Sequence, residues 1–108
     1  MKYGNKPTEV NGIRFASKHE ALRYVELQYL LRTGEIKDLR LQVPFELIPK
    51  QMEHGKCVER AVKYVADFVY EDQNGNLIVE DAKGFRTDVF RLKKKLFRSV
   101  YGIGIREV

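Results

Sequence analysis

One stretch constrains the fold of this chain more than any other: residues 65–85 read "VADFVYEDQNGNLIVEDAKGF". Two runs of apolar and β-branched residues flank an Asn-Gly pair, and this pattern predicts a β-hairpin. Asp67 lies inside the first predicted strand, whereas Asp81 and Lys83 lie inside the second. A buried charge is costly unless it is paired or bound to a metal ion. The hairpin therefore predicts either an ordinary salt bridge on a partly solvated surface or a functional site.

The turn decides whether the three charges meet. "DQNG" fits a type I turn followed by a left-handed Gly75, a three-residue loop that pairs Asp72 with Asn76 and sets Asp67 opposite Asp81. A two-residue Asn-Gly loop would put the two carboxylates on opposite faces instead. We favour the longer loop because it keeps four apolar side chains on one side: Val65, Val69, Leu77 and Val79. Facing carboxylates repel each other, and a divalent cation would remove that cost.

The remaining segments predict two helices and two further strands. Ser17 and Glu20 match the S-x-x-E capping box at the start of "SKHEALRYVELQYLLRTG", and Gly34 ends this helix. Residues 39–50 look extended, with two prolines typical of an edge strand. The hairpin strands run near 57–71 and 77–84, a second helix runs from Thr87 to Tyr101, and "IGIREV" forms a short strand.

This order of helix, three strands, helix and strand (αβββαβ) predicts an α+β fold, an α/β sandwich with a mixed sheet. The last strand returns beside the hairpin through a helical crossover. The 108 residues suffice for a single domain, in which residues 1–15 are an arm that is flexible or contacts a dimer partner.

The composition restricts the location and the kinds of site that this chain can have. No apolar run approaches the roughly 20 residues that span a bilayer, and the chain lacks a secretory leader pattern, so we expect a cytoplasmic protein. One cysteine and two separated histidines exclude a disulfide framework and a zinc cluster of the usual spacing. Cys57 is expected to be a half-buried strand residue. A metal site would have to be built from carboxylates, which suits Mg²⁺ or Mn²⁺.

The net charge of +5 is concentrated in the second predicted helix. A stripe of four cations lies across from an apolar arc, from which a fifth cation, Lys93, projects; the stripe is Arg91, Lys94, Lys95 and Arg98. Such a stripe is usually a solvated face, but four cations that no acid relieves suit a phosphate backbone. These five residues are the DNA-binding candidates.

The first predicted helix supplies one more candidate for the site. A helical wheel places Glu20 with Tyr24 and Leu27 on the inward face, whereas Glu26 falls on the polar side. Glu20 is also the capping-box acid, so a structural role competes with a role in the site.

Five blocks of the sequence together resemble a known nuclease superfamily. They are "KYGNKPTEVNGIRFASKHEALRY", "GEIKDLRLQ", "FELIP", "YVADFVY" and "VEDAKGF". The sequence resembles the PD-(D/E)XK nucleases, and most closely a small phage-borne family of unknown function within that superfamily. The resemblance extends to the superfamily's Holliday-junction resolvases, and it implies a restriction-endonuclease-like core.

The resemblance also implies roles for individual residues. Asp67, Asp81, Glu20 and the carbonyl of Ala82 would hold Mg²⁺, with Mn²⁺ as a substitute, and Lys83 would be the catalytic lysine. Gln42 and Glu80 are secondary candidates. The implied protein is a homodimeric phage or prophage endonuclease that hydrolyses branched or junction DNA in the bacterial cytoplasm. The alternatives are an inactive nucleic-acid-binding protein on the same fold and a replisome-interaction module.

Overall fold

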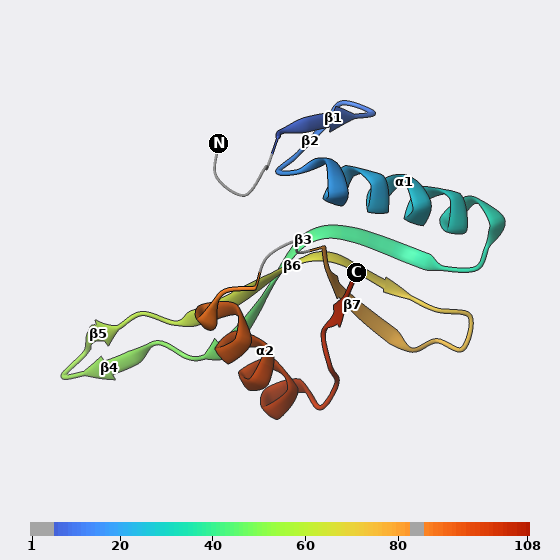
Figure 1. Cartoon of the computed structure of the whole chain (residues 1–108). Helices are drawn as coiled ribbons and strands as arrows, with labels where there is room; N and C mark the ends of the chain where they lie inside the picture. Colours follow the sequence, from blue (N-terminus) through green and yellow to red (C-terminus); the bar gives the residue numbers. More distant parts are fainter. Residues whose placement is uncertain (1–5, 83–85) are drawn as a thin grey trace.

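The computed structural model describes residues 6–82 and 86–108, and this part of the chain builds a mixed sheet with a helix on either face (Figure 1). The core elements are α1 (Lys18–Thr33), β3 (Lys37–Ile48), β6 (Val62–Glu71), β7 (Leu77–Asp81), α2 (Asp88–Tyr101) and β8 (Arg106–Glu107). The sheet order is β3-β6-β7-β8, antiparallel except for the parallel pair β7 and β8. The predicted αβββαβ order and helical crossover are therefore confirmed.

Both helices begin and end where the sequence predicts. The Ser17 hydroxyl accepts a hydrogen bond from the Glu20 amide at 3.1 Å, and Gly34 ends α1 in the left-handed conformation. Thr87 caps α2 by accepting from the Phe90 amide at 3.0 Å, and Gly102 ends that helix. These are local side-chain and backbone preferences, which explains why spacing alone locates them.

Two apolar clusters hold the helices against opposite faces of the sheet. The first lies under α1 and contains Phe15, Ala21, Tyr24, Leu27, Ile36, Phe68, Tyr70 and Ala82. The second lies under α2 and contains Leu47, Tyr64, Ala66, Val69, Val79, Phe90, Phe97 and Ile105. Two separate cores give the domain three layers, as predicted for an α/β sandwich.

The turn between β6 and β7 is the predicted three-residue loop. The Asp72 amide donates to the Asn76 carbonyl at 3.0 Å, and Gly75 has a φ of 81°. Phe68 pairs with Glu80 at the end of this ladder, and just beyond it the Ala82 amide donates to Asp67 Oδ2 at 2.9 Å. The hairpin register set by the predicted three-residue loop is confirmed.

The expectation that side chains alternate strictly along β6 is wrong, however. Ala66 packs under α2 but Phe68 packs under α1, although alternation puts residues two apart on one face. On the neighbouring strand, Leu41 and Val43 divide between the two clusters in the same way. The pairing keeps one register on both sides of this point, where Gln42 has a left-handed φ of 52°. The predicted group of four valine and leucine side chains is therefore split, and Val65 and Leu77 are exposed.

Two small hairpins complete the described structure. The first, β1 (Thr8–Val10) with β2 (Ile13–Phe15), lies within the segment expected to be an arm, and Phe15 is buried against α1. The second, β4 (Gln51–Glu53) with β5 (Lys56–Glu59), projects from the body and has every residue exposed (Figure 1). Cys57 lies on this hairpin and is exposed, so its expected half-burial is wrong. No described helix has the length and apolar character needed to cross a membrane.

A buried ion pair fixes how α1 sits on the sheet. Glu80 is fully buried on the side of β7 that faces α1, and its two oxygens accept from the Arg23 guanidinium at 2.8 and 2.6 Å. Tyr70 donates its hydroxyl to the same carboxylate. Burial, followed by this hydrogen bond, raises the pKa of Tyr70 to about 12. Glu80, a secondary site candidate, is thus fully engaged in joining helix to sheet.

Replacing Arg23 by methionine should lower the free energy of unfolding by about 3–5 kcal/mol, because it leaves the Glu80 charge buried without its main partner. In a Glu80→Gln background the same replacement should cost much less. Urea unfolding followed by circular dichroism measures both. Arg32→Met, at the last turn of the same helix, should change stability by less than about 0.5 kcal/mol. An equal loss in both backgrounds would contradict this account.

Candidate functional site

Three polar side chains from three different elements form a connected group at the point where the strands change faces. The Gln42 amide nitrogen on β3 donates to Glu20 Oε2 on α1 and to Asp67 Oδ1 on β6, each at 3.2 Å. Asp67 Oδ2 in turn accepts from the Ala82 backbone amide at the end of β7, at 2.9 Å. One amide group therefore lies between two carboxylates that are separated by 47 positions in the sequence.

This group lines a cavity of about 350 Å³ on the α1 side of the molecule. The walls come from β2, the start of α1, β3 and β6; they are formed by Ile13, Arg14, Phe15, Ala16, Glu20, Leu41, Gln42 and Asp67. The cavity has the size of a small-ligand site, with an apolar lining and a few convergent polar groups. Glu20 is 7% exposed, which is rare for a carboxylate without a specific role.

The structure also settles how Glu20 takes part in the helix cap. The Ser17 hydroxyl accepts from the Glu20 backbone amide, so that half of the predicted capping box is present. The Glu20 carboxylate accepts from Gln42 across the cavity. The backbone of Glu20 thus belongs to the cap, and its side chain belongs to the group around Gln42.

Asp81 lies beside this group but makes its hydrogen bond toward α2. It is 1% exposed, and its Oδ1 accepts from the Tyr64 hydroxyl at 2.9 Å. Burial raises the pKa of Tyr64 far above its usual range, and the charges of Asp81 and Asp67 raise it further. Both carboxylates are therefore close enough to act on one phenol, although the described contacts do not join them directly.

The remaining predicted members of the site divide into two groups. Lys83 lies outside the described residues, so its convergence with the acids stays a prediction. Ala82 is buried at the end of β7, and its amide holds Asp67 in place. Glu80 points to the opposite side of β7 from Asp81, where Arg23 and Tyr70 bind it. Adjacent acids on one strand thus serve different faces of the sheet.

The donor set can be tested against a divalent cation. Within residues 6–82 and 86–108, no group of three or more Asp, Glu, His or Cys side chains is arranged to hold a metal ion. Hard oxygen ligands are nevertheless present on Glu20, Asp67 and Gln42. The Gln42 amide nitrogen now donates to both carboxylates, and it therefore lies where a cation bound between them would be expected. Rotation of the Gln42 amide would direct its oxygen to the same point. The chemical type of these ligands therefore suits a hard cation, and Asp81 lies nearby.

The expectation that no acid relieves the basic stripe is wrong. Glu107 of β8 binds Lys94, and its other oxygen pairs with Arg86 at 2.5 Å. These cations hold the pKa of Glu107 below its usual range. Arg91 pairs with Asp88 at 3.3 Å. Neither Lys95 nor Arg98 makes an ion pair with an acid in the described part of the chain, so these two remain the available cations of the stripe.

Lys93 lines a different hollow, of about 280 Å³, with Lys63, Tyr64 and Val65 from β6. The hollow lies between the start of β6, which pairs with β3 but extends beyond its pairing with β7, and the beginning of α2. Lys93 therefore belongs with Lys63 beside Tyr64 and not with the solvent-facing stripe.

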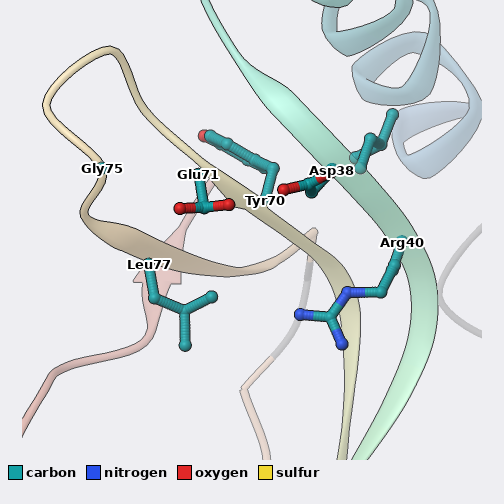
Figure 2. Close-up of a pocket in the computed structure, with 7 residues that line it drawn as sticks. Asp38, Arg40, Tyr70, Glu71, Gly75 and Leu77 are labelled. Carbon is teal, nitrogen blue, oxygen red and sulfur yellow. The ribbon is translucent and has the colours of Figure 1, made fainter.

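Another cavity, of about 520 Å³, lies away from this group, at the turn end of β7 (Figure 2). The carboxyl groups of Asp38 and Glu71 face each other there. The pKa of Glu71 lies above its ordinary value, because its protonated carboxyl donates a hydrogen bond to Asp38. This cavity contains none of the residues predicted for the site.

Sequence reasoning missed two residues that the structure places at or beside the acids, Tyr64 and Arg14. Tyr64 could have been found from strand periodicity: it is two residues before Ala66, so both side chains lie on one inward face, near Asp81. Nothing in the pattern of Arg14 distinguishes it from other exposed cations.

Replacing Gln42 by methionine keeps the length of the side chain but removes the donor between Glu20 and Asp67. In EDTA this should lower the free energy of unfolding by about 1–3 kcal/mol, because two carboxylates lose their shared partner. Urea unfolding measures the change. Gln51→Met on the exposed β4 is the matched control and should be nearly neutral. Equal effects of the two replacements would show that the amide does not hold the group together.

Comparisons with known proteins identify the family of this chain but do not indicate what reaction or ligand the site serves. No curated protein and no solved structure matches the chain. A family model described as "Protein of unknown function (DUF1064)" matches residues 1–105, which is nearly the whole length. The chain therefore belongs to the DUF1064 family.

Proposed function

We propose that this protein is a Mg²⁺-dependent DNA endonuclease with a restriction-endonuclease-like core of the PD-(D/E)XK type. The observation that carries the proposal is the group formed by Glu20, Gln42 and Asp67 at one cavity, directly beside the buried Asp81. Carboxylates from a helix and from two neighbouring strands are brought near one another, although burial makes Glu20 and Asp81 costly. Such placement of acids is typical of a functional site.

The roles of the residues follow from their contacts. Asp67 and Glu20 would hold the cation, with Asp81 as the third carboxylate and the Ala82 carbonyl as a further ligand. The Ala82 amide and Gln42 orient Asp67, while Tyr64 orients Asp81, so the ligands are held by their neighbours before any ion binds. Bound Mg²⁺ or Mn²⁺ would supply charge stabilisation at the scissile phosphate and a water of lowered pKa. Lys83, two residues after Asp81, is the proposed catalytic lysine.

Branched or junction DNA is the proposed substrate, and a homodimer is the proposed assembly. The described elements form a core large enough for a catalytic site, and they include little further structure that could read base edges. Two sites in a two-fold assembly could cut two strands. A phage or prophage protein acting in the bacterial cytoplasm during replication or recombination fits this activity.

The second candidate is a nucleic-acid-binding protein without catalysis. It is favoured by the observation that the Gln42 amide bridges Glu20 and Asp67, so that one neutral side chain serves both carboxylates. In that case the acids form a structural network, and only the basic surfaces contact DNA.

Asp81→Asn separates the two candidates, because it removes a ligand charge while the amide oxygen can still accept from Tyr64. Mg²⁺-dependent cleavage of a four-way junction should fall by about two or more orders of magnitude. DNA affinity in EDTA should persist or rise, because a negative charge near the phosphate is lost. The measurements are gel assays of cleavage and fluorescence anisotropy of binding.

Glu26→Gln is the control, since Glu26 is exposed and contacts Arg23, not the acidic group around Gln42. Its activity should stay near that of the parent. If the parent binds DNA but cuts no supercoiled, linear or junction substrate in Mg²⁺ or Mn²⁺, the non-catalytic candidate replaces the nuclease.

The basic face of α2 predicts a specific salt dependence. Replacing Lys95 and Arg98 by glutamine should reduce the slope of log affinity against log salt by about 2, because each cation that contacts a phosphate contributes about 0.9. Replacing Arg91 and Lys94 should reduce it less, because Asp88 and Glu107 already neutralise them. Anisotropy titrations at several salt concentrations measure both slopes. Unchanged slopes in both variants would mean that this face does not contact DNA.

A further inference from the structure

Arg14 is a cation at the edge of the acidic cavity that no part of the proposed mechanism yet uses. It lies on β2, is exposed, and lines the same cavity as Glu20 and Asp67. Glu9 is its cross-strand partner in the register of β1 and β2. No ion pair joins Arg14 to Glu9 or to another acid among the described residues. Its guanidinium is thus available to an external anion.

The hairpin that carries Arg14 is held firmly against α1. Asn11 and Gly12 have φ values of 52° and 79°, which is the geometry of a two-residue type I′ turn. Phe15, the next residue after Arg14, is buried and packs its ring 4.9 Å from that of Tyr24. Since Tyr24 and Glu20 lie on the same helix, this packing positions the backbone of Arg14 relative to Glu20.

The cavity between Arg14 and the acids is mostly apolar. Ile13, Phe15 and Leu41 contribute to its walls. A phosphate group alone would gain little from these side chains, whereas a sugar attached to the phosphate would contact them. A phosphate near Glu20 and Asp67 also requires a compensating cation, because the carboxylates repel it.

We propose that this cavity is a phosphate-and-sugar subsite of the substrate strand. Arg14 binds the phosphate of a nucleotide next to the bond that is cut, and Ile13 and Leu41 contact its deoxyribose. Arginine suits this role because its planar guanidinium can donate two parallel hydrogen bonds to one phosphate. The inference rests on the proposed nuclease function and adds a substrate-positioning residue to it.

The first experiment measures DNA affinity with Ca²⁺ in place of Mg²⁺, together with single-turnover cleavage in Mg²⁺. Arg14→Gln should weaken binding of a single-stranded or junction substrate by about tenfold to a hundredfold, the range for losing a charged hydrogen bond. Arg14→Lys should recover part of the affinity, because an ammonium keeps the charge but not the paired geometry. Arg32→Gln is the matched control: it removes the same charge from an exposed position in the last turn of α1, and it should change affinity less than twofold.

The second experiment needs no cleavage. Deoxyribose 5-phosphate is titrated into the full-length protein while the arginine Nε–Hε resonances are followed by NMR. The Arg14 signal should shift in the parent, and binding of the sugar phosphate should be lost in Arg14→Gln. Inorganic phosphate should bind more weakly, because it lacks the sugar that contacts Ile13 and Leu41.

The outcomes separate this inference from the function on which it rests. If the parent binds and cuts DNA but Arg14→Gln behaves like Arg32→Gln, the subsite is wrong and the nuclease stands. If the parent cuts no DNA but deoxyribose 5-phosphate shifts the Arg14 resonance, the subsite stands and the nuclease fails. If neither probe affects Arg14, the subsite is overturned. Because Arg14 is exposed, equal melting temperatures of parent and variant check that the fold is unchanged.

Discussion

The change of faces at Gln42 and Asp67 is the constraint from which the candidate site follows. Two long strands pair across this point without a slip in register, yet their apolar side chains pack under α2 on one side of it and under α1 on the other. The left-handed φ of Gln42 accompanies this change. Backbone irregularities of this kind are concentrated at functional sites, because they direct side chains where a regular strand could not. Here the irregularity lets one amide reach Glu20 and Asp67 together.

The two consecutive acids that end β7 show how one strand serves two purposes. Glu80 faces α1 and is neutralised by a paired guanidinium and a phenol, so it connects helix to sheet. Asp81 faces the layer of α2 and accepts from Tyr64 next to the acidic cavity. A buried ion pair is weak evidence for stability but strong evidence that its members cannot be removed singly. The docking of α1, and with it the position of Glu20, therefore depends on the Glu80 pair.

Much of the fold and half of the site geometry could be predicted from local chemistry. The caps at Ser17 and Thr87, the left-handed glycines that end both helices and the Asp72–Asn76 loop all depend on residues a few positions apart. The pairing of Phe68 with Glu80 follows from that loop. The inward position of Glu20 follows from helical periodicity. These features require no knowledge of which surfaces pack together.

Tertiary structure alone decided the rest, because the remaining contacts join residues far apart in the chain. The alternation of residue types could not reveal that the apolar side chains of β3 and β6 change from one face of the sheet to the other. The left-handed backbone at Gln42 accompanies this change, and no glycine marks that position in the sequence. Helix periodicity could not show that Glu107 would neutralise Lys94, because the two meet only when β8 pairs with β7. The position of Arg14 beside Glu20 likewise depends on how the first hairpin packs against α1. The sequence by itself thus determined the elements, their order and the hairpin register, whereas packing between distant segments determined which charges share a cavity.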